Sequence, residues 1–454
     1  MVTETVARFN VNMDYKALPQ EAVRLARKHI MDCLGVALAG SVEPAVDIVA
    51  GYLNDIGGTA EATVVARKFK TSAPQAALLN GVIAHVLDYD DVSWTWNGHP
   101  SVAVLPAVLS LGEKKNASGK EIITAYLTGI EVGAKISLGL KGHYEAGWHA
   151  TATLGTMAAT AAAANLLRLD VRQTQMALGI AASMASGTRQ NFGTMTKPLH
   201  AGKAAYNGVM AASLAQKGFT AEANILEAPM GFARLMGGGD DVERMAQNLG
   251  RPFDIIENGL TLKPYPCCRF AHRCIDAVLY LENKHRIIAD DVAEVICQTS
   301  PLIPTFLLYS SPKTGAEAKF SMQYCMAVAL LDREMGLQQF TETRVNRADV
   351  QTLMTKVRYN HAGKTTTKVG DAMTEPEEVL IKLRNGDELR QTVTLGKGEP
   401  DNPMSDLEVA AKFRDCARLV FTPRKQDRVL ELLMKLESVE RVSELMDTLA
   451  IADT

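Results

Sequence analysis

The chain has 454 residues and a formal net charge of -3 at pH 7, with 48 lysines and arginines against 51 aspartates and glutamates. This length exceeds what one small core requires, so about two domains are expected. The nearly balanced charge argues against a nucleic-acid-binding surface.

Cysteine usage and hydropathy predict a cytoplasmic protein with reduced thiols and no membrane contact. The seven cysteines are an odd number without a repeating frame, and the cluster Cys267, Cys268 and Cys274 lacks the paired spacing of zinc or iron–sulfur sites, so we predict no metal. The longest stretch of low polarity, 150–167, is shorter than the ~20 apolar residues that a bilayer requires. Residues 1–15 carry charges and lack the apolar core of a signal peptide.

The first part of the chain, to about residue 265, has helical periodicity. Pro19, followed by Gln20 and Glu21, opens an amphipathic helix that runs to Gly35, and Pro74 opens the next helix, which continues through Ile83. The segments 102–111 and 203–214 are apolar all round and rich in small residues. Such segments are typical of central helices and not of surface helices.

The pattern changes after Pro266. Segment 292–300 alternates and is rich in Val and Ile, and 378–395 is typical of two strands joined at Asn385-Gly386, a strong hairpin signal. Helical stretches at 271–284, 320–331 and 348–357 accompany these strands. Segment 396–403 is a linker, and 405–449 returns to helical periodicity. We therefore predict a mostly α fold: a helical domain of residues 1–266 and 404–454, with an inserted α+β domain of residues 267–403.

Four short segments gather polar side chains at the ends of apolar helices. Segment 85–101 carries two histidines and three aspartates, and segments 142–149, 193–202 and 265–272 carry four more histidines and a lysine. Carboxylates and imidazoles are costly to bury unless they are paired, and loops on a rigid scaffold are where proteins present chemistry. A purely structural Asp/His network is the alternative interpretation.

Five motifs in these and later segments resemble those of the MmgE/PrpD family, which includes 2-methylcitrate dehydratases, cis-aconitate decarboxylases and iminodisuccinate epimerases. The resemblance covers nearly the whole chain, and it rests on Leu-Asp-Tyr-Asp-Asp with Gly-His-Pro-Ser (87–101), Gly-Trp-His (147–149), Thr-Lys-Pro-Leu-His (196–200), Tyr-Pro with His272, and Ala-Lys-Phe-Ser with Tyr324. It implies a large helical domain built from both chain ends, a smaller lid domain and a homodimer.

The reactions of this family share one step, the movement of a proton on a carbon next to a carboxylate or imine. That step requires a base, an acid, and cations or donors that hold the other carboxylates. The sequence contains no Gly-x-Gly-x-x-Gly run, Walker loop or Gly-x-Ser-x-Gly elbow, so we expect no cofactor. The expected ligand is a small di- or tricarboxylic acid.

The predicted catalytic residues match motif positions of the family. Asp88 would orient a histidine or carry a proton, and His99 occupies the place of an active-site histidine. His149 precedes a helix whose amides favour a bound carboxylate. Lys197, ahead of an apolar helix, is expected to meet a substrate carboxylate, because an anion would compensate for its poor solvation. His272 would contribute from the lid domain.

The remaining candidates are predicted to bind substrate or to support those groups. They are Asp91, His200, Tyr324 and Lys263. Three of them also have a structural reading: Asp91, along with Asp90, as a cap or ion pair within its loop, His200 as packing beside Lys197, and Tyr324 as part of the core.

The sequence favours a lyase, with an epimerase as the close alternative. Tyr144 and Lys197 on opposite faces of a substrate would supply the two proton carriers that epimerisation requires. Val92 stands where the decarboxylases of the family have threonine, and the loop to His99 is one residue longer than theirs, which argues against decarboxylation of cis-aconitate but not against dehydration of another acid. A non-catalytic binding protein with the same fold is the least favoured alternative.

Overall fold

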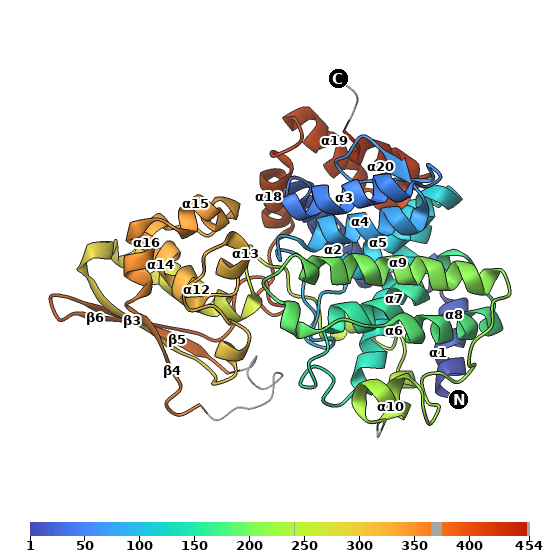
Figure 1. Ribbon diagram of the computed structural model, residues 1–454, viewed down its shortest axis with the longest axis horizontal. Coiled ribbons are helices and arrows are strands. Elements are labelled where there is room, and N and C mark those ends of the chain that lie inside the picture. The colour runs from blue at the N-terminus through green and yellow to red at the C-terminus, as the bar shows by residue number, and fades with distance from the viewer. Residues whose placement is uncertain (240, 365–374, 452–454) are drawn as a thin grey trace. The chain divides into compact units, whose positions relative to one another are not determined.

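The computed structural model describes residues 1–239, 241–364 and 375–451 (Figure 1). Within these ranges the chain forms two compact units. The first contains residues 1–86, 90–260 and 405–454, and the second contains residues 87–89 and 261–404. The described elements are mostly helical, which confirms the predicted fold class.

The first unit is a helical assembly in which the predicted helices are present. Pro19 precedes α2, which extends beyond the predicted end to Gly40, and Pro74 lies in the first turn of α4. Its helices are α1 (Val2–Asn12), α2 (Gln20–Gly40), α3 (Pro44–Ile56), α4 (Ala73–His85), α5 (Ser101–Lys115), α6 (Gly119–Leu138), α7 (Ala150–Leu166), α8 (Val171–Met184), α9 (Thr196–Gln216), α10 (Phe232–Gly237), α11 (Asp254–Glu257), α18 (Asp406–Ala417), α19 (Pro423–Met434) and α20 (Val442–Leu449).

Helices α4, α5, α7 and α9 form the centre of this unit. Nearly every residue of α5 is buried, as are most residues of α9 between 203 and 214, which confirms the prediction that these apolar segments are central; α7 is also buried almost throughout. Small residues allow the close packing: a Cβ on Gly81 of α4 would lie 2.6 Å from the Cα of Gly202 of α9. This packing brings together the helix ends that carry the polar segments.

Two predictions for the first unit were wrong in detail. The unit also contains two short antiparallel strands, β1 (Ala62–Thr63) and β2 (Lys70–Thr71), which are too short to show an alternating pattern. Helix α9 begins at Thr196, well before the predicted apolar run, so Lys197 lies in its first turn. Pro198 does not prevent this, because proline is tolerated in the first turn of a helix.

The second unit is an α+β assembly around a four-stranded sheet. The sheet order is β4-β3-β5-β6, with β3 parallel to β4 and antiparallel to β5. The predicted hairpin is present, and its turn contains Gly386 at φ +94°. Figure 1 shows the helices of this unit on one face of the sheet. The elements are α12 (His272–His285), β3 (Val292–Gln298), α13 (Gly315–Ala318), α14 (Met322–Asp332), α15 (Glu342–Val345), α16 (Ala348–Met354), β4 (Val357–Asn360), β5 (Glu377–Leu383) and β6 (Glu388–Val393).

One helix of the second unit was predicted too long. Helix α16 ends at Met354, and Val357, the predicted last helical residue, begins β4. Strand β4 gains its hydrogen bonds from β3, about sixty residues earlier in the chain, and such pairing leaves no local signal in a four-residue strand.

No single helix among the described residues is long and apolar enough to cross a membrane. Helices α2 and α3 together reach that length and composition, but the chain bends by 86° between them.

Candidate active site

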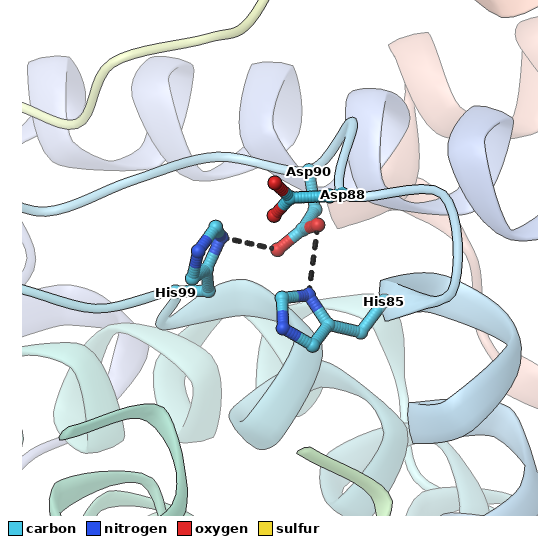
Figure 2. Close-up of side chains that lie close together, drawn as sticks. All are labelled: His85, Asp88, Asp90 and His99. Carbon is cyan, nitrogen blue, oxygen red and sulfur yellow. Dashed lines mark hydrogen bonds and ion pairs between the residues drawn. The ribbon is translucent and has the colours of Figure 1, made fainter. Parts of the chain in front are cut away.

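In the first unit, the buried carboxylate of Asp90 lies between two imidazoles (Figure 2). Its Oδ1 is 2.9 Å from Nδ1 of His85, and its Oδ2 is 2.8 Å from Nδ1 of His99. His85 is the last residue of α4, and His99 lies just before α5, so the loop between these helices folds back on itself. His99 is the more accessible of the two, with 12% of its side chain exposed against none for His85.

Three predicted residues from α7 and α9 lie beside this group. His149 caps the N-terminus of α7, and its Nδ1 is 3.0 Å from Nδ1 of His200. The ring of His149 is stacked on that of His85 with 6.1 Å between centroids, and it contacts Phe192 edge-on at 4.9 Å. Lys197 is buried, with its Nζ 5.3 Å from the centroid of the Phe192 ring. The structure therefore brings His99, His149, Lys197 and His200 together, as the sequence predicted.

Burial and the charge of Lys197 lower the pKa of His85, His149 and His200. Burial first, and then Lys197, hold the pKa of His149 well below its usual range and lower that of His200 to about 4. Burial also lowers the pKa of His85 to about 3, although Asp90 acts in the opposite direction. Burial acts to raise the pKa of Asp90, but its two imidazole partners more than offset this and hold that pKa well below the usual value.

This group of side chains places imidazoles, which can act as bases, beside the positive charge of Lys197. Neutral imidazoles have a lone pair that can accept a proton, and His85 and His149 each have a buried Nε2 without a hydrogen-bond partner in the part of the chain that the structure describes. The buried ammonium group of Lys197 complements an anion. We name His85, Asp90, His99, His149, Lys197 and His200 the histidine cluster.

Tyr144 lies on the chain segment that leads to His149. Its ring faces the Arg189 guanidinium at 3.7 Å, and Nη1 of Arg189 donates a hydrogen bond to the Tyr144 carbonyl oxygen. The backbone of His149 donates to Gly187, so segments 144–149 and 187–189 are fastened together. The phenol of Tyr144 thus belongs to the same rigid loop as His149.

Asp91 is bonded within the core of the first unit. Its Oδ2 lies 2.9 Å from Nδ1 of His29 on α2 and accepts a hydrogen bond of 2.5 Å from the hydroxyl of Ser101 on α5. The Ser101 hydroxyl also contacts the Tyr126 hydroxyl of α6. These bonds favour the structural reading of Asp91 over the prediction that it binds substrate.

In the second unit, two predicted residues that are distant in sequence are paired. Nζ of Lys263 donates to Oδ1 of Asp88 at 3.0 Å and to its carbonyl oxygen at 2.7 Å, and both side chains are buried. Asp88 has a φ of +52°, and further bonds from Lys319 to the Leu87 carbonyl and from Tyr89 to the Pro264 carbonyl hold this segment. Asp88 is therefore a fixed, charge-compensated carboxylate.

His272 is the first residue of α12, one residue after the predicted start of this helix at 271. It is completely buried, and its Nε2 lies 3.1 Å from the carbonyl oxygen of Cys267. Burial, followed by the charges of Arg269 and Lys263, holds its pKa well below the usual value. Because a carbonyl only accepts, Nε2 carries the proton and Nδ1 the lone pair, and Nδ1 has no hydrogen-bond partner among the described residues.

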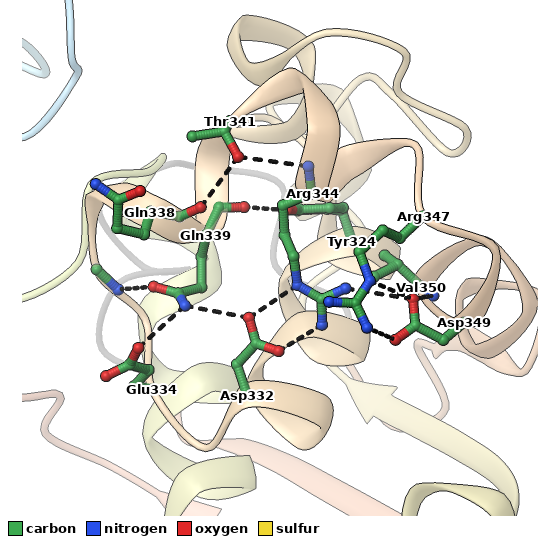
Figure 3. Close-up of polar contacts among 11 residues, drawn as sticks. Tyr324, Asp332, Glu334, Gln338, Gln339, Thr341, Arg344, Arg347, Asp349 and Val350 are labelled. Carbon is green, nitrogen blue, oxygen red and sulfur yellow. Dashed lines mark hydrogen bonds and ion pairs between the residues drawn. The ribbon is translucent and has the colours of Figure 1, made fainter.

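Tyr324 belongs to the core of the second unit (Figure 3). Its hydroxyl donates to the carbonyl oxygen of Gln339, and burial raises its pKa. The Gln339 side chain continues this network to Asp332, which is paired with Arg344. These contacts favour the structural reading of Tyr324.

His85, Asp90 and His99 are also the donor types that bind divalent metal ions, and one atom of each lies within 4.8 Å of the others. Two ligands of a tetrahedral zinc ion, each about 2.1 Å from it, lie about 3.4 Å apart. The contacts of 2.8 and 2.9 Å around Asp90 are shorter, and the one with His85 is a hydrogen bond while the one with His99 is an ion-pair contact.

His85 and Asp90 belong to this site, but the sequence did not predict either of them as a catalytic or substrate-binding residue. Asp90 was interpreted as a cap or a local pair, and His85 had no assigned role. The available signal was their spacing, because a histidine at a helix end five residues before an aspartate can meet it when the chain turns back. The contact of Asp90 with His99 depends on the fold of the whole loop.

The geometry defines a mostly helical protein with buried imidazoles and a buried lysine, a set of groups suited to moving protons on a small anion. Residues 4–245 match the MmgE/PrpD N-terminal domain, and residues 265–438 match the MmgE/PrpD C-terminal domain. The chain therefore belongs to the MmgE/PrpD family, which confirms the resemblance seen in its motifs.

The chain is similar along almost its whole length to proteins described as cis-aconitate decarboxylases. It is 27% identical to the one from Mus musculus over 458 residues, which cover 97% of this chain and 92% of the relative. It is 25% identical to the one from Homo sapiens, covering 97% and 93%, and 24% identical to one from Aspergillus terreus strain NIH 2624, covering 99% and 96%.

Proposed function

We propose that this protein is a cofactor-independent lyase, a dehydratase or decarboxylase, that acts on a small di- or tricarboxylic acid. The observation that carries the proposal is the histidine cluster, in which neutral imidazoles lie beside a buried lysine. The similarity to cis-aconitate decarboxylases supports a carboxylic acid as substrate and a lyase as the reaction class.

In the proposed reaction, Lys197 pairs with one substrate carboxylate and fixes the acid beside the imidazoles. In a dehydration, Nε2 of His99 takes the proton from the carbon next to a carboxylate, and the imidazolium so formed returns that proton, directly or relayed by His149, to the departing hydroxyl, which leaves as water. In a decarboxylation, the carbon–carbon bond breaks, carbon dioxide leaves, and the remaining carbon takes a proton that an imidazole relays from solvent. Both reactions use the groups that the cluster supplies.

The test is an assay of purified protein against a panel of di- and tricarboxylic acids, cis-aconitate and hydroxy acids included. A dehydratase produces a double bond, seen as ultraviolet absorbance, and a decarboxylase releases carbon dioxide. If no acid in the panel yields either an unsaturated product or carbon dioxide, the lyase proposal is contradicted. The homodimer, the cytoplasmic location and the contribution of His272 stay predictions.

Chelation is expected to leave the activity unchanged. Proton transfer next to a carboxylate needs no metal when a buried cation such as Lys197 holds the substrate, and the contacts of 2.8 and 2.9 Å around Asp90 are shorter than the spacing of two zinc ligands. Protein treated with EDTA and then desalted is compared with untreated protein in the same assay. Activity that the chelator removes and one divalent metal restores would contradict the cofactor-free proposal.

The second candidate function is epimerisation of an iminodisuccinate-like acid. The observation that favours it is the position of Tyr144, whose ring is held by Arg189 on the loop that ends at His149. An epimerase removes a proton from one face of a carbon and returns one to the other, and Tyr144 and Lys197 are candidate carriers.

The Tyr144→Phe variant in deuterium oxide distinguishes these functions. For the lyase we expect this variant to keep most of its activity, within about tenfold, because removal of one hydroxyl leaves the imidazoles intact. Mass spectrometry measures deuterium in the recovered acid. An unchanged acid skeleton that gains one deuterium, with this exchange abolished in Tyr144→Phe, would replace the lyase proposal by the epimerase.

A further inference from the structure

A cavity of about 500 Å³ lies in the first unit, away from the histidine cluster. Its wall is formed by the end of α1 and the turn that follows it, the start of α6 and the end of α7. Helix α7 has His149 at its N-terminus and Leu166 of the cavity wall at its other end, so its 17 residues separate the two sites by about 25 Å. The volume is within the usual range of about 300–1,000 Å³ for sites that bind small organic molecules.

Apolar and aromatic side chains form part of this wall. Leu166 and Leu169 are buried, and Met13 and Tyr15 are half-buried. Apolar surface favours an apolar ligand, and both a tyrosine ring and a methionine sulfur make favourable contacts with aromatic rings. The wall is therefore suited to the flat body of an aromatic molecule.

Both carboxylates of the wall already have partners. Oδ1 of Asp14 accepts hydrogen bonds of 2.9 and 3.0 Å from two backbone amides of the turn that follows it. Glu121 accepts hydrogen bonds from Ser118, and it is paired with Nη2 of Arg168 at 2.8 Å. Neither carboxylate therefore needs a cationic ligand.

Lys16 and Lys120 also belong to the wall, and neither forms an ion pair with a carboxylate in the described part of the chain. Nζ of Lys120 lies over the ring of Tyr15, 5.4 Å from its centroid, so positive charge lies beside the aromatic part of the wall. An anionic group on an aromatic ligand would meet this charge. Such a pair gains more at the edge of an apolar cavity than it would in open water.

Asn10 adds a hydrogen-bond acceptor to the wall. Its Nδ2 donates to the carbonyl oxygen of Ala161 at 2.7 Å, which leaves Oδ1 on the other side of the amide. This oxygen is buried and has no hydrogen-bond partner within the described ranges. A buried acceptor without a donor is unfavourable, and a hydroxyl group on the ligand would supply the donor.

We propose that this cavity is a second binding site, which takes a small aromatic carboxylate that carries a hydroxyl group. The carboxylate pairs with Lys16 and Lys120, the ring lies against Tyr15 and Leu166, and the hydroxyl donates to Oδ1 of Asn10. The site is independent of the proposed function, because none of the described residues that line it belongs to the histidine cluster.

Isothermal titration calorimetry of the whole protein with 6-hydroxy-2-naphthoate, in the absence of any substrate, tests this site. The probe carries the carboxylate, the aromatic body and the hydroxyl group, whereas 2-naphthol lacks the carboxylate and 2-naphthoate lacks the hydroxyl. We expect one molecule of probe to bind per chain, and each of the other two compounds to bind about tenfold more weakly or less tightly still. No saturable binding of the probe, or equal affinity for the three compounds, would overturn the proposal.

The double variant Lys16→Ala/Lys120→Ala is expected to weaken the binding of the probe by about tenfold or more, because it removes both lysine charges from the wall. Lys203→Ala, which removes an exposed lysine of α9, is the matched control and is expected to bind the probe as the natural protein does. Unchanged affinity in the double variant would overturn the proposal.

Lys197→Ala distinguishes the cavity from the histidine cluster. This variant is expected to keep the affinity of the natural protein for the probe. A loss of binding in Lys197→Ala would assign the probe to the histidine cluster and overturn the proposal. The lyase proposal fails or stands separately, because the panel of acids is assayed without the probe and the probe is titrated without any acid of the panel.

Discussion

Lys197→Ala is expected to lower kcat/KM by roughly two to four orders of magnitude. Lys197 lies in the first turn of α9 with only 4% of its surface exposed, and its charge is strong enough at this place to lower the pKa of His85, His149 and His200. A substrate carboxylate that pairs with a cation in such a poorly solvated place gains more than it would in water. Steady-state kinetics on the acid that the panel identifies measures the effect.

Lys203→Ala on the same helix is the control for this prediction. Lys203 is exposed, and its Nζ lies over the ring of Tyr206 at 4.5 Å, so its loss removes a lysine without touching the histidine cluster. We expect Lys203→Ala to keep kcat/KM within about twofold. If Lys197→Ala melts at a markedly lower temperature yet keeps its catalytic activity, Lys197 is structural.

The elements that the sequence predicted best are those whose signals are local. The all-round apolarity of α5, the proline before α2 and the Asn-Gly turn between β5 and β6 are each signals carried by a few neighbouring residues. Strand β4 and the pair β1–β2 are short and depend on partners elsewhere in the chain. Their sequences carry too few residues for a pattern.

The candidate site divides in the same way. Histidines at helix ends can be recognised by their residue type and by the glycine and proline around them, so the sequence predicted His99, His149 and His200 as site residues. Which polar groups pair is decided by the fold. Lys263 and Asp88 are paired although they are 175 residues apart in the sequence. The adjacent residues Asp90 and Asp91 have different partners: Asp90 belongs to the histidine cluster, whereas Asp91 is bonded to His29 and Ser101.

Adjacent aspartates could not be told apart from the sequence, because their environments depend on how one loop turns. Ser93 and Gly98 pair across this loop, which returns His99 to the side of Asp90. Asp91 comes one residue later and reaches α2 and α5. The run of aspartates therefore indicated that a site was present. The partners of each aspartate depend on how the loop between α4 and α5 folds.

His99→Ala and His149→Ala are each expected to lower kcat by about 10²–10⁴-fold, the usual contribution of one general acid or base. Both rings belong to the histidine cluster: Nδ1 of His99 lies 2.8 Å from Asp90 and its ring is partly accessible, whereas burial and Lys197 lower the pKa of His149, which can relay a proton. The double variant is expected to lose much less than the product of the two single effects, since the groups act in one proton transfer. Single-turnover kinetics separates this loss from slower product release.

The control for these variants is His285→Ala, at the exposed end of α12, which is expected to keep full activity. Added imidazole should restore part of the rate of His99→Ala, because the small base can occupy the space that the ring leaves, and it should not affect His285→Ala. Thermal unfolding of each variant checks that the fold persists. A His99→Ala protein that is folded and retains most of its kcat would remove His99 from the chemistry and leave His149 or His272 as the base.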